Sequence, residues 1–342
     1  TLADSLANLT AADPAVVAGA GSYTLTDTAL TAANVANVTV ADLAAAQADA
    51  VKAVHDDALV AAATNGATIL VNDGAYTLAD SLANLTAADP AVVADAGSYT
   101  LSDAVGSLAD LSVATAGFVA DATNAGSYTY TLNDSLANVV GADSTLVSGH
   151  DVTLSDSSID STNLVSVLSK TTGLVDASAA TNDLTVDFSA FTTNVNFKAG
   201  SGADLIKAGT GVDTLSGGAG TDTFAFAAGS NGAVFGQADV ITDFVIGTDK
   251  LQFTNVTAVE STEQSSVQSA VDALTAGSTA AQIASAMATA NTTDFGVSFA
   301  TFEGNSYVLQ EASGIATGVA ANDVFIQLTG VATAPTFADV IA

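Results

Sequence analysis

Three aspartates spaced nine residues apart, Asp204, Asp213 and Asp222, are the side chains of this sequence best placed to bind a ligand. Each follows one glycine by four positions and another by two, within three nonapeptides that run without a gap over residues 199–225. Glycine allows positive φ values that turn backbone carbonyls toward one point, and Ca²⁺ prefers carboxylate and carbonyl oxygens. An apolar residue also recurs two positions after each aspartate, which a flexible glycine-rich linker would not maintain. The spacing therefore predicts calcium sites.

The nonapeptides resemble those of the repeats-in-toxin (RTX) family, whose pattern is Gly-Gly-x-Gly-x-Asp-x-apolar-x, although Ala199 and Ala208 replace the first glycine. The resemblance implies a parallel β-roll whose successive turns lie on opposite sides. Asp204 then pairs with Asp222, while Asp213 has no partner within the three copies. The predicted metal ligands are Gly200, Gly202, Asp204, Gly209, Gly211, Asp213, Gly218, Gly220, Asp222, Asp239 and Asp243.

The sequence after the nonapeptides predicts a closing segment and a mixed α+β cap. Residues 239–253 resemble the segment that closes RTX rolls, and Asp239, Asp243 and Asp249 there are either further ligands or turn residues. Apolar periodicity predicts two helices over residues 263–290, then a hairpin (297–302 and 307–310) and a strand at 324–328. The uncharged end after Asp339 resembles an uncleaved type I secretion signal, which accounts for the lack of a visible N-terminal leader.

The first half of the sequence is repetitive. Residues 1–27 recur at 77–103 with two differences, and a shorter Tyr-Thr-Leu-x-Asp box marks each unit. The boxes are Tyr23–Asp27, Tyr76–Asp80, Tyr99–Asp103 and Tyr130–Asp134, with a weaker one at Val152–Asp156. Each box predicts a short strand with Tyr and Leu on one face, whose aspartate caps the helix that follows, as Asp80 would cap the helix containing Leu82 and Leu85. The period predicts an α/β solenoid with parallel strands; separately duplicated α+β modules are the alternative.

The sequence opens inside a repeat, so we expect it to be a processed product or a fragment of a longer chain. The open strand edge at Thr1–Asp4, with Leu6 and Leu9 beside it, predicts pairing with another subunit. A helix over 41–64, within the alanine-rich segment 31–70, could instead fold back and seal that edge.

These patterns together predict a mainly β protein with α/β repeats. Its expected regions are a strand–helix repeat region (1–160), a parallel β-roll (161–253), and a C-terminal cap with the secretion-signal region (254–342).

The charge balance excludes several function classes. The sequence has 36 acidic residues and only 5 basic ones, all of them lysine, which gives a net charge of −31. Nucleic-acid binding and adhesion to anionic lipid both need a cationic surface. A compact chain of this charge needs screening, which favours a divalent cation. Cysteine is absent, so there is no disulfide framework. The sequence also contains no uninterrupted apolar run of about 18 residues, so no membrane span is predicted.

The sequence predicts no enzyme. Its two histidines, His55 and His150, lie outside any His-Glu-x-x-His motif, and each is expected on a solvated surface. There is no Gly-x-Ser-x-Gly nucleophile elbow. Carboxylate pairs could hydrolyse glycosides, but tryptophan, a common sugar platform, is absent.

We therefore expect a secreted, calcium-dependent structural protein of the bacterial cell surface that self-assembles into a surface layer or extracellular filament. Its expected partner is itself, with cell-surface polysaccharide as a second candidate. The alternatives are the repeat stalk and anchor of a type I-secreted adhesin, and a secreted hydrolase whose catalytic domain is missing.

Overall fold

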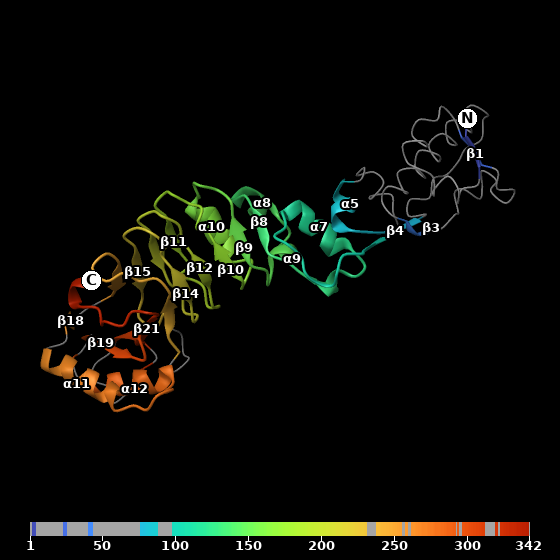
Figure 1. The fold of residues 1–342 in the computed structure, drawn as a ribbon. Helices are drawn as coiled ribbons and strands as arrows, with labels where there is room; N and C mark the ends of the chain where they lie inside the picture. The colour runs from blue at the N-terminus through green and yellow to red at the C-terminus, as the bar shows by residue number, and fades with distance from the viewer. Residues whose placement is uncertain are drawn as a thin grey trace. The chain divides into compact units, whose positions relative to one another are not determined.

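The chain divides into two compact units, Thr1–Tyr130 and Thr131–Ala342 (Figure 1). This computed structural model describes residues 2–4, 23–25, 40–43, 76–87, 98–230, 237–254, 257–258, 261–291, 293, 296–311, 319–320 and 322–341. The predicted boundaries at residues 160 and 253 both fall inside the second unit, because one sheet continues from the strand–helix repeats through the roll into the cap.

The described part of the first unit contains short parallel strands, two helices and a 3₁₀ turn. Strands β1 (Leu2–Asp4) and β2 (Tyr23–Leu25) pair with each other, β3 (Val40–Leu43), β4 (Tyr76–Asp80) and β5 (Ser98–Leu101) form a second sheet, and β6 (Gly106–Ser107) pairs with β7 (Tyr128–Thr129). The described helices are α5 (Leu82–Ala87), α7 (Val113–Asp121) and the 3₁₀ turn η1 (Ala125–Ser127).

The helix predicted over residues 41–64 is wrong at its start, where 41–43 belong to β3 and pair with β4. The rest of that helix lies outside the described residues, as do Leu6, Leu9 and His55.

The faces of a box strand follow the predicted alternation in β5. Tyr99 and Leu101 are buried while Thr100 between them is half-exposed. In α5, Leu82 and Leu85 share the buried face. Alternate side chains of a strand point to opposite faces, so the box buries its large residues and leaves threonine outside.

The box aspartates cap helices differently from the prediction. Serine is the local cap: the Asn84 N–H donates to Ser81 Oγ at 3.2 Å, ahead of α5. Asp103, in the next box, instead accepts the Leu82 N–H at 2.7 Å. A helix start leaves several N–H groups without intrahelical partners, so two acceptors can serve one helix. Asp103 thus stabilises the helix of the preceding repeat.

The second unit repeats this arrangement at helix α8 (Leu136–Gly141). Asp156, one box further along, accepts the Leu136 N–H at 2.5 Å, and Ser135 is the local cap. At the other end of α8, Lys170 Nζ donates to the carbonyl oxygens of Val140 at 2.6 Å and Ala142 at 3.0 Å. A cation at a helix C-terminus is favourable, so both ends of α8 are held by the following repeat.

The boundary between the units coincides with an extra Tyr-Thr pair in the fourth box (127–132, Ser-Tyr-Thr-Tyr-Thr-Leu). The first pair forms β7 in unit one, where the buried Tyr128 hydroxyl donates to the Asp103 carbonyl at 3.0 Å. The second precedes β8 (Leu132–Asp134), the first strand of unit two, and Tyr130 is only half-buried. Because of the extra Tyr-Thr pair, residues 128–134 contain both the last strand of the first unit, β7, and the first strand of the second, β8.

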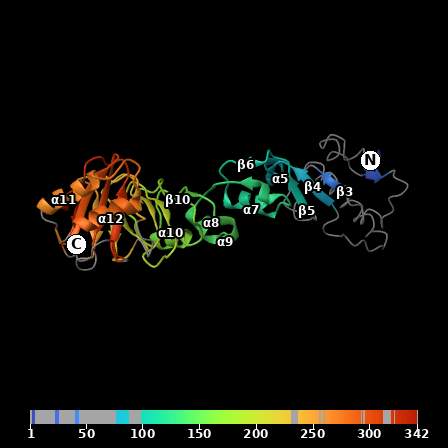
Figure 2. The same ribbon diagram turned by 90° about the horizontal axis from the view of Figure 1, so that it is seen from below.

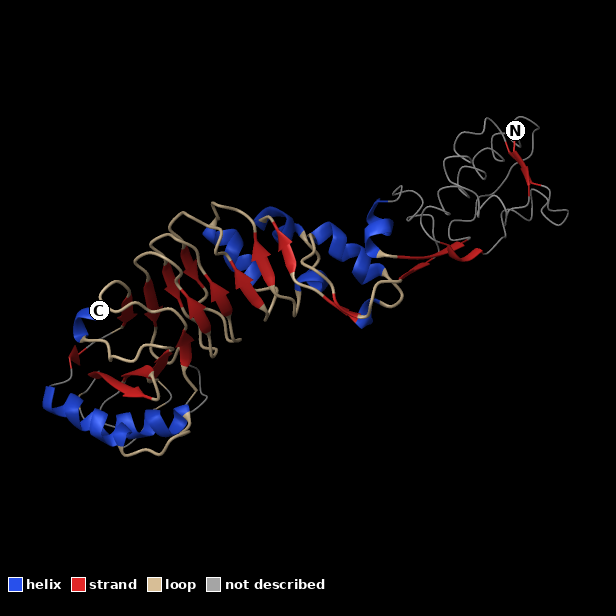
Figure 3. Cartoon of the chain, viewed as in Figure 1, coloured by secondary structure: helices blue, strands red, loops and turns tan. Residues whose placement is uncertain are grey.

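The second unit is built on a ten-stranded sheet and a five-stranded sheet (Figure 3). The ten-stranded sheet has the order β18-β19-β20-β21-β16-β14-β12-β10-β9-β8, and the five-stranded sheet has the order β11-β13-β15-β17-β22. The bounds in the repeats and the roll are β9 (Val152–Leu154), β10 (Leu174–Asp176), β11 (Thr185–Asp187), β12 (Asn196–Lys198), β13 (Leu205–Lys207), β14 (Thr214–Ser216), β15 (Thr223–Phe226), β16 (Asp239–Ile241) and β17 (Lys250–Phe253), with helices α9 (Ser144–Val147) and α10 (Ser161–Leu168).

Successive strands from β10 to β17 alternate between the two sheets, and each pairs in parallel with the strand two positions on. The apolar residues at the eighth nonapeptide position, Ile206, Leu215 and Phe224, are fully buried. The prediction of a mainly β chain with parallel sheets is confirmed, and these two sheets form the β-roll.

The C-terminal segment caps the roll with antiparallel strands and two helices. The elements are β18 (Thr257–Ala258), α11 (Ser261–Asp272), α12 (Ala280–Ala290), β19 (Gly296–Phe302), β20 (Asn305–Gln310), β21 (Val324–Leu328), η2 (Phe337–Asp339) and β22 (Val340–Ile341). Helices α11 and α12 lie along one face of β19–β21 (Figure 2) and bury Val267, Val271, Ile283 and Met287. The predicted hairpin and strand are present, and Glu303 and Gly304 turn the hairpin with positive φ of 48° and 79°.

Replacing Asp103 with Ala should loosen the helix that precedes it in sequence. Loss of a helix N-terminal acceptor costs about 1 kcal/mol. We expect the amide of residue 82 to exchange with deuterium about fivefold faster. Asp110→Ala in the same unit is the control, because the exposed Asp110 makes no polar contact with the described residues. Equal exchange in both variants would contradict capping between repeats.

Candidate calcium site

The aspartates of the five-stranded side form a column along the roll. The Leu184 N–H donates to Asp204 Oδ1 at 2.7 Å, the Asp204 N–H to Asp222 Oδ1 at 2.9 Å, and the Asp222 N–H to Asp249 Oδ1 at 3.0 Å. Each carboxylate therefore accepts the amide at the equivalent position of the preceding turn. The structure brings Asp204 and Asp222 together, as the resemblance implied.

The other side carries a second column of the same kind. The Val195 N–H donates to Asp213 Oδ1, and the Asp213 N–H to Asp239 Oδ1, each at 2.8 Å. Asp213 thus has a stacked partner, and the expectation that it lacks one holds only within the three nonapeptides. The partner is hidden in the sequence because residues between β15 and β16 lengthen the spacing from nine or eighteen residues to 26.

One oxygen of several column carboxylates has no hydrogen-bond donor. Oδ2 of Asp204, Asp213 and Asp239 is buried and accepts no hydrogen bond. A buried carboxylate oxygen without a donor or cation is costly. These are the oxygens that a bound cation would satisfy.

The glycines let successive turns of the roll stack closely on one another. A Cβ on Gly218 would lie 1.9 Å from the Gly200 oxygen, and one on Gly220 would lie 2.0 Å from the Gly202 oxygen. Added Cβ atoms at Gly200, Gly202, Gly209 and Gly211 would lie 2.1–2.5 Å from carbonyl oxygens of the preceding turn. Any side chain would push the turns apart.

The reason for glycine differs between the copies. Only in the third copy do the glycines have positive φ, 88° at Gly218 and 148° at Gly220. In the first two copies the φ values are ordinary, so glycine is required there for close stacking alone. The predicted need for positive φ is therefore wrong for four of the six positions.

The donor set fits Ca²⁺ if backbone carbonyls complete it. Within the described ranges, no group of three or more His, Cys, Asp or Glu side chains surrounds one point. Ca²⁺ takes six to eight oxygen ligands and readily accepts backbone carbonyls. The carboxylates of Asp204, Asp213, Asp222 and Asp239, with the glycine-turn carbonyls, are the residues that would hold the ion.

Burial disfavours the charged form of every column aspartate. It raises the pKa of Asp213 and of Asp222 to about 6, and it raises the pKa of Asp239 well above the usual value. The pKa values of Asp204 and Asp249 are also raised by burial. Protons and calcium therefore compete for the same oxygens.

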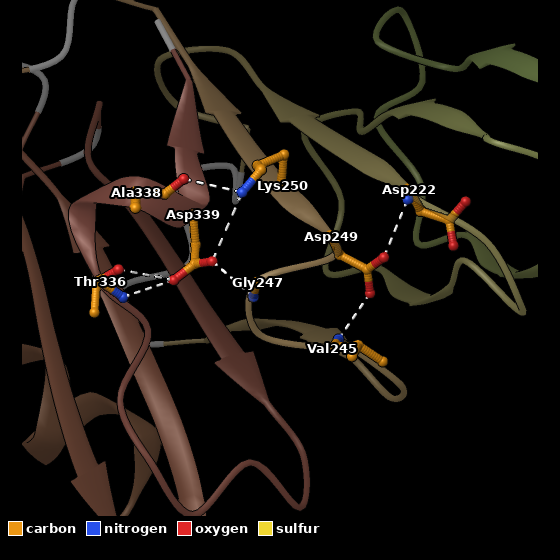
Figure 4. Close-up of polar contacts among 8 residues, drawn as sticks. All are labelled: Asp222, Val245, Gly247, Asp249, Lys250, Thr336, Ala338 and Asp339. Atoms are coloured by element: carbon orange, nitrogen blue, oxygen red, sulfur yellow. Dashed lines mark hydrogen bonds and ion pairs between the residues drawn. The ribbon is translucent and has the colours of Figure 1, made fainter.

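The remaining predicted acids use both oxygens to hold backbone turns. Asp243 accepts the N–H groups of Gly217 at 3.0 Å and Gly218 at 2.8 Å through different oxygens. Asp249 accepts from Asp222 and, at 2.7 Å, from Val245 (Figure 4). These contacts favour turn residues over ligands at both positions, which the sequence left open.

The lysines of the roll neutralise other carboxylates. Lys198 Nζ lies 3.1 Å from Asp176 Oδ2, and Lys207 Nζ lies 3.1 Å from Asp187 Oδ2, each on the paired strand. Lys250 lies 3.8 Å from the buried Asp339. Among the described residues, no lysine therefore forms an ion pair with a column aspartate.

Two acceptors that sequence reasoning missed start the roll. The Ala203 N–H donates to Asp183 Oδ1 at 2.8 Å, and the Val212 N–H to Asn194 Oδ1 at 2.9 Å. Both stand at the fifth position of a turn that lacks the glycine pattern. A signal was available in retrospect, because each lies directly before an apolar residue that aligns with a column aspartate.

Comparison with known proteins agrees with this geometry. Residues 198–232 match the family model described as "RTX calcium-binding nonapeptide repeat (4 copies)". These repeats bind calcium and are typical of secreted proteins. The described helices include none long and apolar enough to cross a membrane.

The other comparisons add little. No curated protein matches the sequence. Among solved structures, the chain is similar to the R3 subunit of a mannuronan C5-epimerase from Azotobacter vinelandii, at 18% identity and a TM-score of 0.24. That match covers 47% of this chain and 77% of the other.

Asp213→Asn and Asp222→Asn should both abolish most of the stabilisation that calcium gives the roll. Ligand binding to the folded state adds about 2.7 kcal/mol when free calcium is about 100 times Kd. Asparagine keeps the oxygen that accepts the backbone N–H but removes the charge. The measurement is Tm with calcium and with chelator, and exposed Asp272→Asn in α11 is the control. A loss confined to Asp222→Asn would show that the second column binds no ion.

Without calcium, the roll should lose stability as pH rises. The column carboxyls have raised pKa values, so between about pH 4 and 6 the folded state binds more protons than the unfolded state. Unfolding free energy in chelator should therefore fall through this range, whereas calcium affinity should increase. Urea titrations and calorimetry across pH test both trends. Metal-free stability that rises over the same interval would contradict the burial of these groups.

Proposed function

We propose that this chain is a secreted, calcium-binding structural protein of the bacterial cell surface that self-assembles into a surface layer or extracellular filament. The observation that carries the proposal is the pair of columns with buried carboxylate oxygens that lack donors. Their satisfaction depends on calcium, and extracellular calcium modules typically bind at about 0.1–1 mM. A protein built this way is ordered where calcium is abundant.

A structural role, with no catalysis, fits the side chains available. The sequence lacks the zinc-protease and serine-hydrolase motifs and has no tryptophan. The well-formed features of the described part are ladders of short parallel strands, which build an extended scaffold. We propose the protein itself as principal partner, with cell-surface polysaccharide as a second candidate.

One observation favours an adhesin stalk as the second candidate. Strands β8 and β9 of the repeat region share a sheet with β10, β12 and β14 of the roll. Such continuity could transmit load from a repeat stalk to a calcium-stabilised anchor.

Electron microscopy of the purified full chain distinguishes these functions. In about 5 mM calcium, well above the extracellular binding range, we expect ordered sheets or filaments, and their loss in chelator. Monomers that bind cells or polysaccharide without assembling would favour the stalk. Particles that remain monomeric and unbound with calcium would reject both.

A further inference from the structure

Exposed apolar side chains gather at the C-terminal end of the roll. Of the five large hydrophobic residues exposed in the described part of the chain, four are Val245, Ile246, Phe337 and Ile341, with 36–52% of their surface accessible. The fifth is Val105, in the first unit. We call these four residues the end face.

The end face is held in place by polar contacts beneath it (Figure 4). The Gly247 N–H donates to Asp339 Oδ1 at 2.9 Å, which ties the loop of Val245 and Ile246 to the segment of Phe337. Lys250 Nζ donates to the Ala338 carbonyl at 2.9 Å. Asp339 also accepts from the Thr336 N–H at 2.9 Å. Although burial raises the pKa of Asp339, the hydrogen bonds from Thr336 and Gly247, together with Lys250, hold it below the usual value. The two segments therefore form one fixed surface.

An unpaired strand edge adjoins this surface. Strand β22 pairs with β17 and is the last strand of the five-stranded sheet. No strand among the described residues pairs with its other edge, beside which Ile341 is exposed. An edge with free backbone groups and an apolar neighbour is a template for strand addition.

The end face lacks the charge that covers this protein elsewhere. Residues 244–248 and 329–338 contain no ionisable side chain. Of the charged residues that flank them, Asp249 and Asp339 are only 4% and 2% exposed, and Asp243 and Lys250 are half-buried. Two copies of a chain with net charge −31 repel one another wherever exposed carboxylates meet, and this surface presents fewer of them. A basic partner would bind the acidic surfaces instead.

We propose that the end face is a two-fold interface between copies of this chain, with β22 of one copy antiparallel to β22 of the other. Such an isologous contact uses one surface twice and joins the two five-stranded sheets through backbone hydrogen bonds. The interface rests on the proposed self-assembly and names one of its contacts. Extended assembly requires a second contact elsewhere on the molecule.

Single-cysteine variants test the symmetry, because the natural sequence has no cysteine. A two-fold interface brings residue 341 close to its own copy, and a disulfide requires Cα atoms within about 7 Å. Under mild oxidation in calcium, Ile341→Cys should form a covalent dimer, while the exposed control Val105→Cys should stay monomeric. No dimer from Ile341→Cys, or equal dimer from both variants, would overturn the interface.

Charge placed on the surface tests its contribution to assembly. Phe337→Asp with Ile341→Asp should weaken dimerisation at least tenfold by sedimentation velocity, because like charges across an interface repel. Both side chains are exposed, so circular dichroism and calcium titration should match the wild type. Wild-type assembly that persists unchanged in this variant would reject the end face and leave the proposed function standing. A wild-type chain that stays monomeric with calcium would reject both.

Discussion

The stacking of the second unit depends on the two oxygens of each column carboxylate, which have different partners. One oxygen accepts the backbone N–H of the preceding turn, and in Asp204, Asp213 and Asp239 the other is buried without a donor. The first contact fixes the stacking distance, while the second oxygen creates the demand for a cation. The glycines follow from the same constraint, because a Cβ would occupy the space in which the turns meet. The apolar residue two positions after each aspartate then packs between the sheets.

The sequence predicts this arrangement well where its period is strict. The nine-residue spacing identifies the buried positions of Ile206, Leu215 and Phe224 and the pairing of Asp204 with Asp222. It fails where the spacing changes, because the residues between β15 and β16 separate Asp239 and Asp249 from their columns. The sequence spacing shows which residues of successive turns stack on one another only while every turn has the same length. Beyond such an insertion, only the three-dimensional stacking shows which aspartates belong together.

The repeat region shows a second limit of local reasoning. A serine or aspartate directly before a helix is expected to cap that helix, and Ser135 does so for α8. The additional acceptor, Asp156, is 20 residues away from the N–H that it binds. Nothing in a single repeat signals this contact, since it exists only when the next strand is stacked alongside. Stability in this region is therefore shared between neighbours, as expected for a solenoid.

Asparagine and aspartate side chains at equivalent places in the chain differ in whether the backbone alone satisfies their hydrogen bonds. Asn124 accepts the Leu101 N–H and donates to the Leu101 carbonyl, at 3.0 and 2.9 Å, and Asn182 forms the same pair with Ile159 at 2.9 and 3.1 Å. An asparagine can thus satisfy both backbone groups alone, whereas Asp204, Asp213 and Asp239 in the roll each keep one buried oxygen without a hydrogen-bond partner. At the far end, Asp339 is neutralised by Lys250 and backbone donors. The demand for calcium is consequently confined to the turns between these two closures, where the carboxylates stack without fixed cations.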